Sequence, residues 1–349
     1  MKIFLLYALS LFLILIFLPA ALVGGWWRWE HPQVQHQHKR AEGLLKEAAP
    51  HSQEIILKIY AVERGEIIEK ELEEYLVGVV AAEMPASFHL EALKAQAVAA
   101  RTYALSKAVF FGGNGCQSHP GAELCTDSRC CQAWEEERES IKKWPAKEAS
   151  FYLEQIREAV RSTRNLVIAY QGGLISAVYH STCGGNTEAA VEVWSGGEKH
   201  PYLQRVECPY CRHSPHYEGE VVMELSAYTA ALYSKREALA ALAEGSLPFL
   251  QIIKRSSSGR NLQVKVNPGG EILTGGQVRE MLGLPSTHFQ MRLEGEKIIF
   301  RTRGYGHGVG MCQYGADGMA KEGKDFMEIL QYYFQGVEVV DYRFFVREE

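Results

Sequence analysis

The stretch AAEMPASFHLEALKAQAVAARTYALS, residues 81–106, decides the fold, and the rest of the chain is organised around it. An apolar pattern with helical spacing leads into it and stops at Pro85, which has no backbone N–H with which to continue a helix. An alanine-rich segment restarts near His89, and its apolar residues recur with a period of about 3.6 as far as Ala108. The sequence therefore predicts two consecutive helices, the second lined with small residues that allow close approach.

One carboxylate, Glu83, comes just before this break and is flanked by apolar residues. Burial destabilises the ionised form of a carboxyl group, so its pKa rises and it can hold a proton near neutral pH. Lys94 and Arg101 are two helical turns apart, so they are expected to share one face of the second helix. An acid beside a basic helix face suits glycosidic acid catalysis; the alternative is that Glu83 is a solvated residue at a helix end.

The segment AAEMPASFHLEALKAQAVAARTYA closely resembles the signature of the stage II sporulation protein D family, and the resemblance extends over residues 54–342. Members of this family are peptidoglycan lytic transglycosylases of endospore formers, and their domain is shared with amidase-enhancer proteins. The resemblance implies that Glu83 is the catalytic acid and that Arg101 is also needed. Lys94 joins Arg101 as a candidate substrate-binding residue.

Residues 3–23 are uncharged and almost wholly apolar, and a helix of that length spans about 30 Å, the thickness of a bilayer core. A tryptophan pair follows, which suits a membrane interface, and no clear small-residue cleavage site comes after it. We therefore predict an uncleaved signal anchor at residues 1–27 rather than a cleaved signal peptide. Residues 28–53 are predicted to form a linker or stalk, and residues 54–343 an extracytoplasmic catalytic domain with one or two subdomains.

The rest of the chain interleaves helix and strand patterns without regular βαβ spacing, which predicts an α+β fold rather than a doubly wound sheet. Further helices are expected at residues 145–162, 226–243, 277–282 and 326–334. Strands are expected at residues 54–62, 166–170, 174–182, 221–224, 249–254, 262–266, 289–293, 297–301 and 337–342, the second and third as a hairpin around two glycines. The net charge of −5 gives no indication of nucleic acid binding.

The loop CQSHPGAELCTDSRCC, residues 116–131, combines thiols and an imidazole at short spacings, which are ligands that zinc prefers. The alternative is disulfides, which an extracytoplasmic domain can form. Adjacent Cys130 and Cys131 pair with each other only with strain, so a purely disulfide account is awkward.

Members of the family hold a zinc with two histidines and two cysteines in a loop after the catalytic helix. The matching residues here are His119, Cys125, Cys130 and Cys131, with Cys130 in place of the second histidine. Four protein ligands leave no open position for water, so the resemblance implies a structural zinc rather than a catalytic one.

A second group of cysteines consists of Cys183, Cys208 and Cys211, the last two in CPYC. This spacing is compatible with a metal site, a small disulfide or redox catalysis. No thioredoxin-like βαβ pattern surrounds it, so redox catalysis is disfavoured. The choice between a metal clip and a disulfide stays open. Cys312 looks solitary, at a position where the family usually carries serine.

Two further motifs carry polar side chains at the ends of expected strands. YHSTCGGNTE begins with Tyr179 and His180, which are candidate substrate-binding residues. The resemblance implies an active-site role for Tyr179, while the alternative is a half-buried strand residue. GYGHGVGMCQYGA resembles another family motif, and its glycines allow close backbone approach, so that His307 and Gln313 can meet a sugar. Glu188, Glu192 and Asp317 are interpreted as surface residues or hydrogen-bond supports.

The leading hypothesis is cleavage between MurNAc and GlcNAc in glycan strands stripped of stem peptides, by one acid and with 1,6-anhydro products. The resemblance implies action at the engulfing mother-cell membrane during sporulation, with stage II sporulation proteins P and M as partners. The alternative is a non-catalytic amidase enhancer that binds the wall. A zinc hydrolase is disfavoured because the expected ligand set is closed.

Overall fold

Two consecutive helices form where the sequence predicts them, α3 at Leu72–Glu83 and α4 at Leu90–Lys107. They belong to a computed structural model that describes residues 54–233, 248–267 and 269–345. The backbone becomes extended at Met84, just before the proline, which ends α3. His89 caps the N-terminus of α4, because its Nδ1 accepts a hydrogen bond from the N–H of Glu91.

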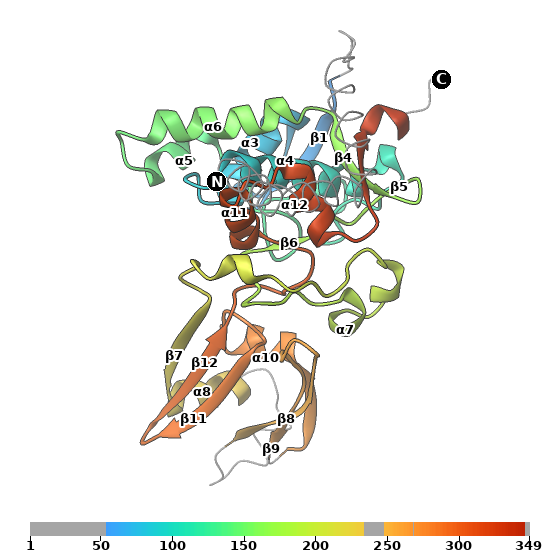
Figure 1. Ribbon diagram of the computed structural model, residues 1–349. Coiled ribbons are helices and arrows are strands. Elements are labelled where there is room, and N and C mark those ends of the chain that lie inside the picture. The colour runs from blue at the N-terminus through green and yellow to red at the C-terminus, as the bar shows by residue number, and fades with distance from the viewer. Residues whose placement is uncertain (1–53, 234–247, 268, 346–349) are drawn as a thin grey trace, which may run out of the picture. The chain divides into compact units, whose positions relative to one another are not determined.

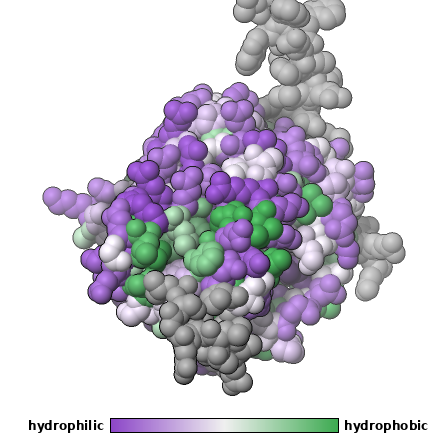
Figure 2. Space-filling view, turned by 90° about the horizontal axis from the view of Figure 1, so that it is seen from below, coloured by the Kyte–Doolittle hydropathy of each residue, from purple (hydrophilic) through white to green (hydrophobic). Residues whose placement is uncertain are grey.

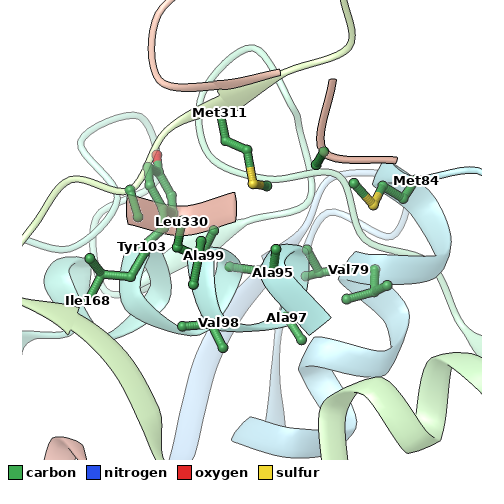
Figure 3. Packing of buried hydrophobic residues seen from close by; sticks show 14 of the residues in the cluster. Val79, Met84, Ala95, Ala97, Val98, Ala99, Tyr103, Ile168, Met311 and Leu330 are labelled. Carbon is green, nitrogen blue, oxygen red and sulfur yellow. The ribbon is translucent and has the colours of Figure 1, made fainter. Parts of the chain in front are cut away.

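The helix α4 is the centre of the first hydrophobic core. All of residues 95–105 are buried, which is typical of a helix that is covered on every side. It contacts α3, α6 (Ala149–Ser162), α11 (Gln313–Lys321), α12 (Phe326–Tyr333) and β4 (Leu166–Tyr170). Figure 3 shows why so many elements fit: the side chains that face these neighbours are mostly alanines.

Three small sheets surround this core. The first has the order β2-β1-β3, with β1 (Ile56–Ala61) antiparallel to β2 (Glu66–Glu71) and parallel to β3 (Leu124–Cys125). The second has the order β14-β4-β5, with β4 in the middle, β14 at Glu338–Asp341 and β5 at Gly173–Leu174.

The third sheet joins two segments that are far apart in the sequence. Its strands are β6 (Tyr179–His180) and β13 (Met311–Cys312), which pair in parallel. Cys312 also caps α11, since its sulfur accepts a hydrogen bond from the N–H of Gly315. The two cysteine- and glycine-rich motifs of the sequence therefore meet at one place.

A second hydrophobic core is built from residues inserted between Cys211 and β13. One of its sheets has the order β11-β12-β7, with strands Phe289–Glu294, Lys297–Arg303 and Glu218–Glu224. The other has the order β10-β9-β8, with strands Glu271–Thr274, Asn261–Asn267 and Phe249–Arg255. The helices α8 (Leu225–Tyr233) and α10 (Gly275–Met281) complete it (Figure 1). The surface seen from below is mostly polar, with apolar residues gathered in a few places (Figure 2).

Shorter helical elements connect these parts: α5 (Glu137–Lys143), α7 (Ala190–Val193), η1 (Val109–Phe111), η2 (Gly197–Lys199), η3 (Pro209–Cys211) and η4 (Tyr342–Phe345). The α+β prediction is confirmed. Among the described residues no helix is long and apolar enough to cross a bilayer. The anchor and stalk predicted at residues 1–27 and 28–53 lie outside the described part of the chain.

One predicted strand, residues 174–182, is wrong as a single element. Its first two residues stay beside β4, Leu174 in β5 and Ile175 through a hydrogen bond from its N–H to the carbonyl of Ile168, and its later residues leave to pair with β13 as β6. The helix predicted at residues 226–243 is confirmed as far as Tyr233, and the remainder lies outside the described residues. Among the elements that have no counterpart in the predictions are the strands β3, β10 and β13 and the helices α5, α7 and α11.

Candidate active site

Glu83 is the last residue of α3, and its partly buried carboxylate is held by two hydrogen-bond donors. The backbone N–H of Ala133 donates to Oε1 at 2.6 Å, and the side chain of Gln313 forms a second hydrogen bond. Burial raises the pKa of Glu83 above its ordinary value, while these two hydrogen bonds lower it in part. Among the described residues no basic side chain forms a salt bridge with Glu83, so the raised pKa is not offset by a nearby cation.

Buried amide side chains and tyrosine hydroxyls lie in the same region as the Glu83 carboxylate. The Tyr179 hydroxyl donates to Oε1 of Gln132 at 2.8 Å, and Nε2 of Gln132 lies 3.3 Å from the Tyr75 hydroxyl. Gln313 donates to Gln96 of α4 at 3.3 Å. We call Glu83, Gln96, Gln132, Tyr179 and Gln313 the site cluster. Burial and the neighbouring charge of Glu83 raise the pKa of Tyr179 well above its ordinary value, so its hydroxyl keeps its proton and remains a donor.

The basic helix face predicted beside Glu83 is not formed, because both cations are engaged elsewhere. Arg101 is completely buried, and its Nε and Nη2 donate to the two carboxylate oxygens of Glu73 at 3.0 and 2.6 Å. Its Nη1 and Nη2 also donate to the carbonyls of Leu166 and Val160. Lys94 pairs with Glu91 one turn away at 2.7 Å. The structure thus places Arg101 as a brace between α3, α4, α6 and β4, not as a group that faces a ligand.

Arg101→Met is expected to lower the free energy of unfolding by about 3–5 kcal/mol, because it leaves the Glu73 carboxylate without its buried partner. The double variant Arg101→Met/Glu73→Met removes both charges and is expected to recover part of that loss. Urea unfolding measures both. If Arg101 instead contacts glycan, the folded single variant will show weakened glycan binding that the double variant does not restore.

The two histidines predicted as substrate-binding residues support the strand that carries Tyr179. Nε2 of His307 lies 2.9 Å from the carbonyl of Tyr179, and its Nδ1 accepts from the N–H of Val309. Nδ1 of His180 lies 3.1 Å from the carbonyl of Val309. Burial lowers the pKa of His307 to about 4 and that of His180 well below its ordinary value, so both rings are neutral near pH 7.

Four thiols meet in the loop after α4: Cys116, Cys125, Cys130 and Cys131, whose sulfurs all lie within 4.8 Å of one another. The predicted ligand set therefore needs one correction, because Cys116 takes the place expected for His119. The His119 ring stacks on Tyr60 with 3.9 Å between ring centroids.

This donor set fits the zinc that the family resemblance implies. A tetrahedron with zinc–sulfur distances of about 2.3 Å has edges of about 3.8 Å. The sulfur of Cys130 lies 3.6 Å from that of Cys116 and 3.8 Å from that of Cys131. The chain runs directly from Cys131 to Gln132 and Ala133, which contact Tyr179 and Glu83. The thiol loop therefore positions two groups of the site.

Gln132 and Gln96 are site residues that the sequence analysis missed. Gln132 directly follows the predicted ligand Cys131, and Gln96 lies on the predicted helix. Their positions in the sequence next to predicted residues could therefore have indicated both. A surface pocket of about 610 Å³ lies elsewhere, beside β1 and residues 114–117, and none of its lining residues belongs to the site cluster.

The fold and site define an α+β protein with a partly buried carboxylate, hydrogen-bonded by a backbone N–H and an amide side chain, at the end of a core helix. The family model described as a stage II sporulation protein matches residues 60–170. Stage II sporulation protein D of Bacillus subtilis is 36% identical over 285 residues, which cover 82% of this chain and 79% of that protein. Its counterpart from Bacillus amyloliquefaciens is 34% identical over 301 residues, covering 86% and 82%.

The chain therefore belongs to the stage II sporulation protein D family, a family of sporulation proteins, as the resemblance of residues 81–106 indicated. It is also similar to the amidase enhancer of Bacillus subtilis, with 28% identity over 312 residues. That match covers 76% of this chain and 40% of the amidase enhancer.

Proposed function

We propose that this protein is a lytic transglycosylase that cleaves peptidoglycan glycan strands between MurNAc and GlcNAc. The observation that carries the proposal is Glu83, a carboxyl group whose pKa is raised by burial. Its backbone donor Ala133 directly follows Gln132, which accepts the hydrogen bond of the Tyr179 hydroxyl. A carboxyl group whose pKa is raised keeps its proton to a higher pH than an exposed one and can deliver it to a glycosidic oxygen.

Glycoside hydrolases usually work with two carboxylates that flank the bond. Within the described residues, four other carboxylates are buried, and each has partners of its own: those of Glu123, Glu188, Asp317 and Asp341. Asp317 accepts hydrogen bonds from the N–H of His89 and from Lys321, and Glu188 accepts one from Ser256. The site cluster therefore supports a reaction that needs one acid.

The proposed reaction uses Glu83 twice. Its protonated carboxyl gives a proton to the glycosidic oxygen as the bond to the MurNAc anomeric carbon breaks. The resulting carboxylate then takes the proton of the C6 hydroxyl of the same sugar, whose oxygen bonds to that carbon and closes the 1,6-anhydro ring. No water is consumed, and the enzyme returns to its protonated form. Tyr179 orients the sugar and stabilises developing charge.

Tyr179→Phe is expected to lower kcat by about a hundredfold, the size of the loss when one donor to developing charge is removed. The same change leaves Oε1 of buried Gln132 without its donor, which costs about 1–3 kcal/mol of stability. Rates on glycan and urea midpoints are measured on the same preparation. A variant that is destabilised but turns over at the normal rate would restrict Tyr179 to a structural role.

The zinc is proposed as structural. Cys116, Cys125, Cys130 and Cys131 would hold it and leave no open position, so that the ion fixes the loop and takes no part in bond cleavage. We further propose that residues 1–27 anchor the protein in the engulfing mother-cell membrane with the catalytic domain outside the cytoplasm. Substrate would be strands that an amidase has stripped, with stage II sporulation proteins P and M as partners.

The second candidate is a non-catalytic protein that enhances an amidase, which is favoured by the similarity to the Bacillus subtilis amidase enhancer. Digestion of stripped glycan strands by the full-length protein, with the products read by mass spectrometry, separates the two. New 1,6-anhydro ends support the transglycosylase. Intact strands, together with a faster amidase in a mixed assay, support the enhancer.

A further inference from the structure

A second group of four thiols lies in the first hydrophobic core, away from the loop described above. It consists of Cys183, Cys208, Cys211 and Cys312, each at most 1% exposed. Their sulfurs all lie within 4.8 Å of one another, and those of Cys183 and Cys211 are 3.4 Å apart. The sequence patterns grouped the first three and left Cys312 solitary; the fold brings it to them.

The spacing of these sulfurs suits a single ion. Four sulfurs about 2.3 Å from one central zinc are about 3.8 Å from each other. The Cys183–Cys211 distance of 3.4 Å is close to this value, and no two sulfurs of the group are more than 4.8 Å apart. An iron–sulfur cluster would hold its cysteine sulfurs further apart, because iron and sulfide atoms lie between them. Tetrahedral sites of four thiolates are typical of zinc.

Hydrogen-bond donors point at these sulfurs, which is the arrangement found around metal-bound thiolates. The backbone N–H groups of Cys183 and Gly315 each lie 3.3 Å from the sulfur of Cys312. The Tyr333 hydroxyl lies 3.1 Å from the sulfur of Cys208. Gly315 is required for this packing, since a Cβ there would lie 2.6 Å from the Cys208 sulfur and 2.0 Å from the Tyr333 oxygen.

We propose that Cys183, Cys208, Cys211 and Cys312 bind a second zinc ion as a closed, structural site. The ligands come from three segments: the turn after β6, the short helix η3, and the junction of β13 with α11. The ion thereby joins the segment that carries Tyr179 to the helix that begins with Gln313, so it fixes two of the segments that build the site cluster. The proposal concerns metal content and does not depend on the proposed reaction.

Metal analysis of the full-length protein, purified without chelator, tests the second site. The expected content is about two zinc ions per chain. Cys312→Ser should reduce it to about one, because serine can still accept the hydrogen bond from Gly315 while the fourth thiolate is lost. The matched variant Cys125→Ser should also leave about one, and the double variant none.

Cobalt substitution provides a second measurement if Cys312→Ser folds poorly. The cobalt form of Cys125→Ser, which keeps this group intact, is expected to show the intense sulfur-to-cobalt absorption of a four-thiolate site. A zinc content of one that Cys312→Ser leaves unchanged would overturn the proposal, as would iron in place of zinc. Alkylation of the denatured, unreduced protein that leaves these four cysteines unmodified would show disulfides instead.

Discussion

Replacing Glu83 by glutamine is expected to lower the rate of glycan cleavage by about ten-thousandfold or more. General acid–base catalysis contributes roughly a hundred- to ten-thousand-fold, and here one group serves both halves of the reaction. Glutamine keeps the shape of the side chain and can still accept the hydrogen bond from Ala133, but it cannot transfer a proton. Glycan binding should therefore persist. Rates are measured from 1,6-anhydro products, and binding by sedimentation with insoluble glycan.

The matched control is Asp317→Asn, which removes the charge of a different buried carboxylate. Asp317 holds His89, His213 and Lys321, so this change is expected to lower stability while the folded protein still forms anhydro products. Full activity in Glu83→Gln would remove the basis of the proposed function. Products with reducing ends would indicate a hydrolase with a second carboxylate, and Asp317 and Glu192 would then be tested as that group.

Glu83→Gln is also expected to change stability: the variant loses activity, but its free energy of unfolding rises at high pH. Burial raises the pKa of Glu83 in the folded state above its value in the unfolded chain. Its contribution to stability is therefore fully present below the unfolded pKa and is lost as the pH rises through the folded pKa. The variant should match the parent at pH 4 and be more stable at pH 8. Equal urea midpoints at both pH values would contradict the raised pKa.

The parts of the fold that the sequence predicts well are those set by local signals. Pro85 ends α3, alanines favour α4, and strand patterns predict five of the six strands of the second core, with β10 as the exception. The helix α11 was missed because its glycines look like loop residues. The reason for these glycines is tertiary: a Cβ at Gly315 would meet Tyr333, and one at Gly318 would lie 2.1 Å from the carbonyl oxygen of Tyr210.

The candidate site shows the same limit. Glu83 and Tyr179 were predicted, and in the structure both contact one short segment, Tyr179 through Gln132 and Glu83 through Ala133. The spacing of Lys94 and Arg101 predicted that they share one helix face, but spacing does not reveal the partner of each cation. Arg101 is buried because it forms a salt bridge with Glu73. Spacing also cannot choose between Cys116 and His119, since the choice depends on how the loop folds back on β1.

Loss of the metal from the thiol loop is expected to have the second large effect. Cys125→Ser should remove about one zinc ion per chain and lower stability strongly, since the apparent binding free energy of a structural zinc is about 10–16 kcal/mol and contributes directly to folding. Because the loop leads into Gln132 and Ala133, the hydrogen bonds to Tyr179 and Glu83 should loosen, and glycan cleavage should fall as well.

Two further variants separate the ligand set that the structure assembles from the set expected from the family resemblance. Cys116→Ser should lose the same metal as Cys125→Ser, because the Cys116 sulfur lies 3.6 Å from that of Cys130. His119→Ala should keep it, because that ring stacks on Tyr60 and lies outside the group of sulfurs. Metal content is read per chain, with unfolding midpoints measured beside it. A metal lost from His119→Ala but kept in Cys116→Ser would restore histidine as the ligand, and no metal in the parent protein would exclude the site.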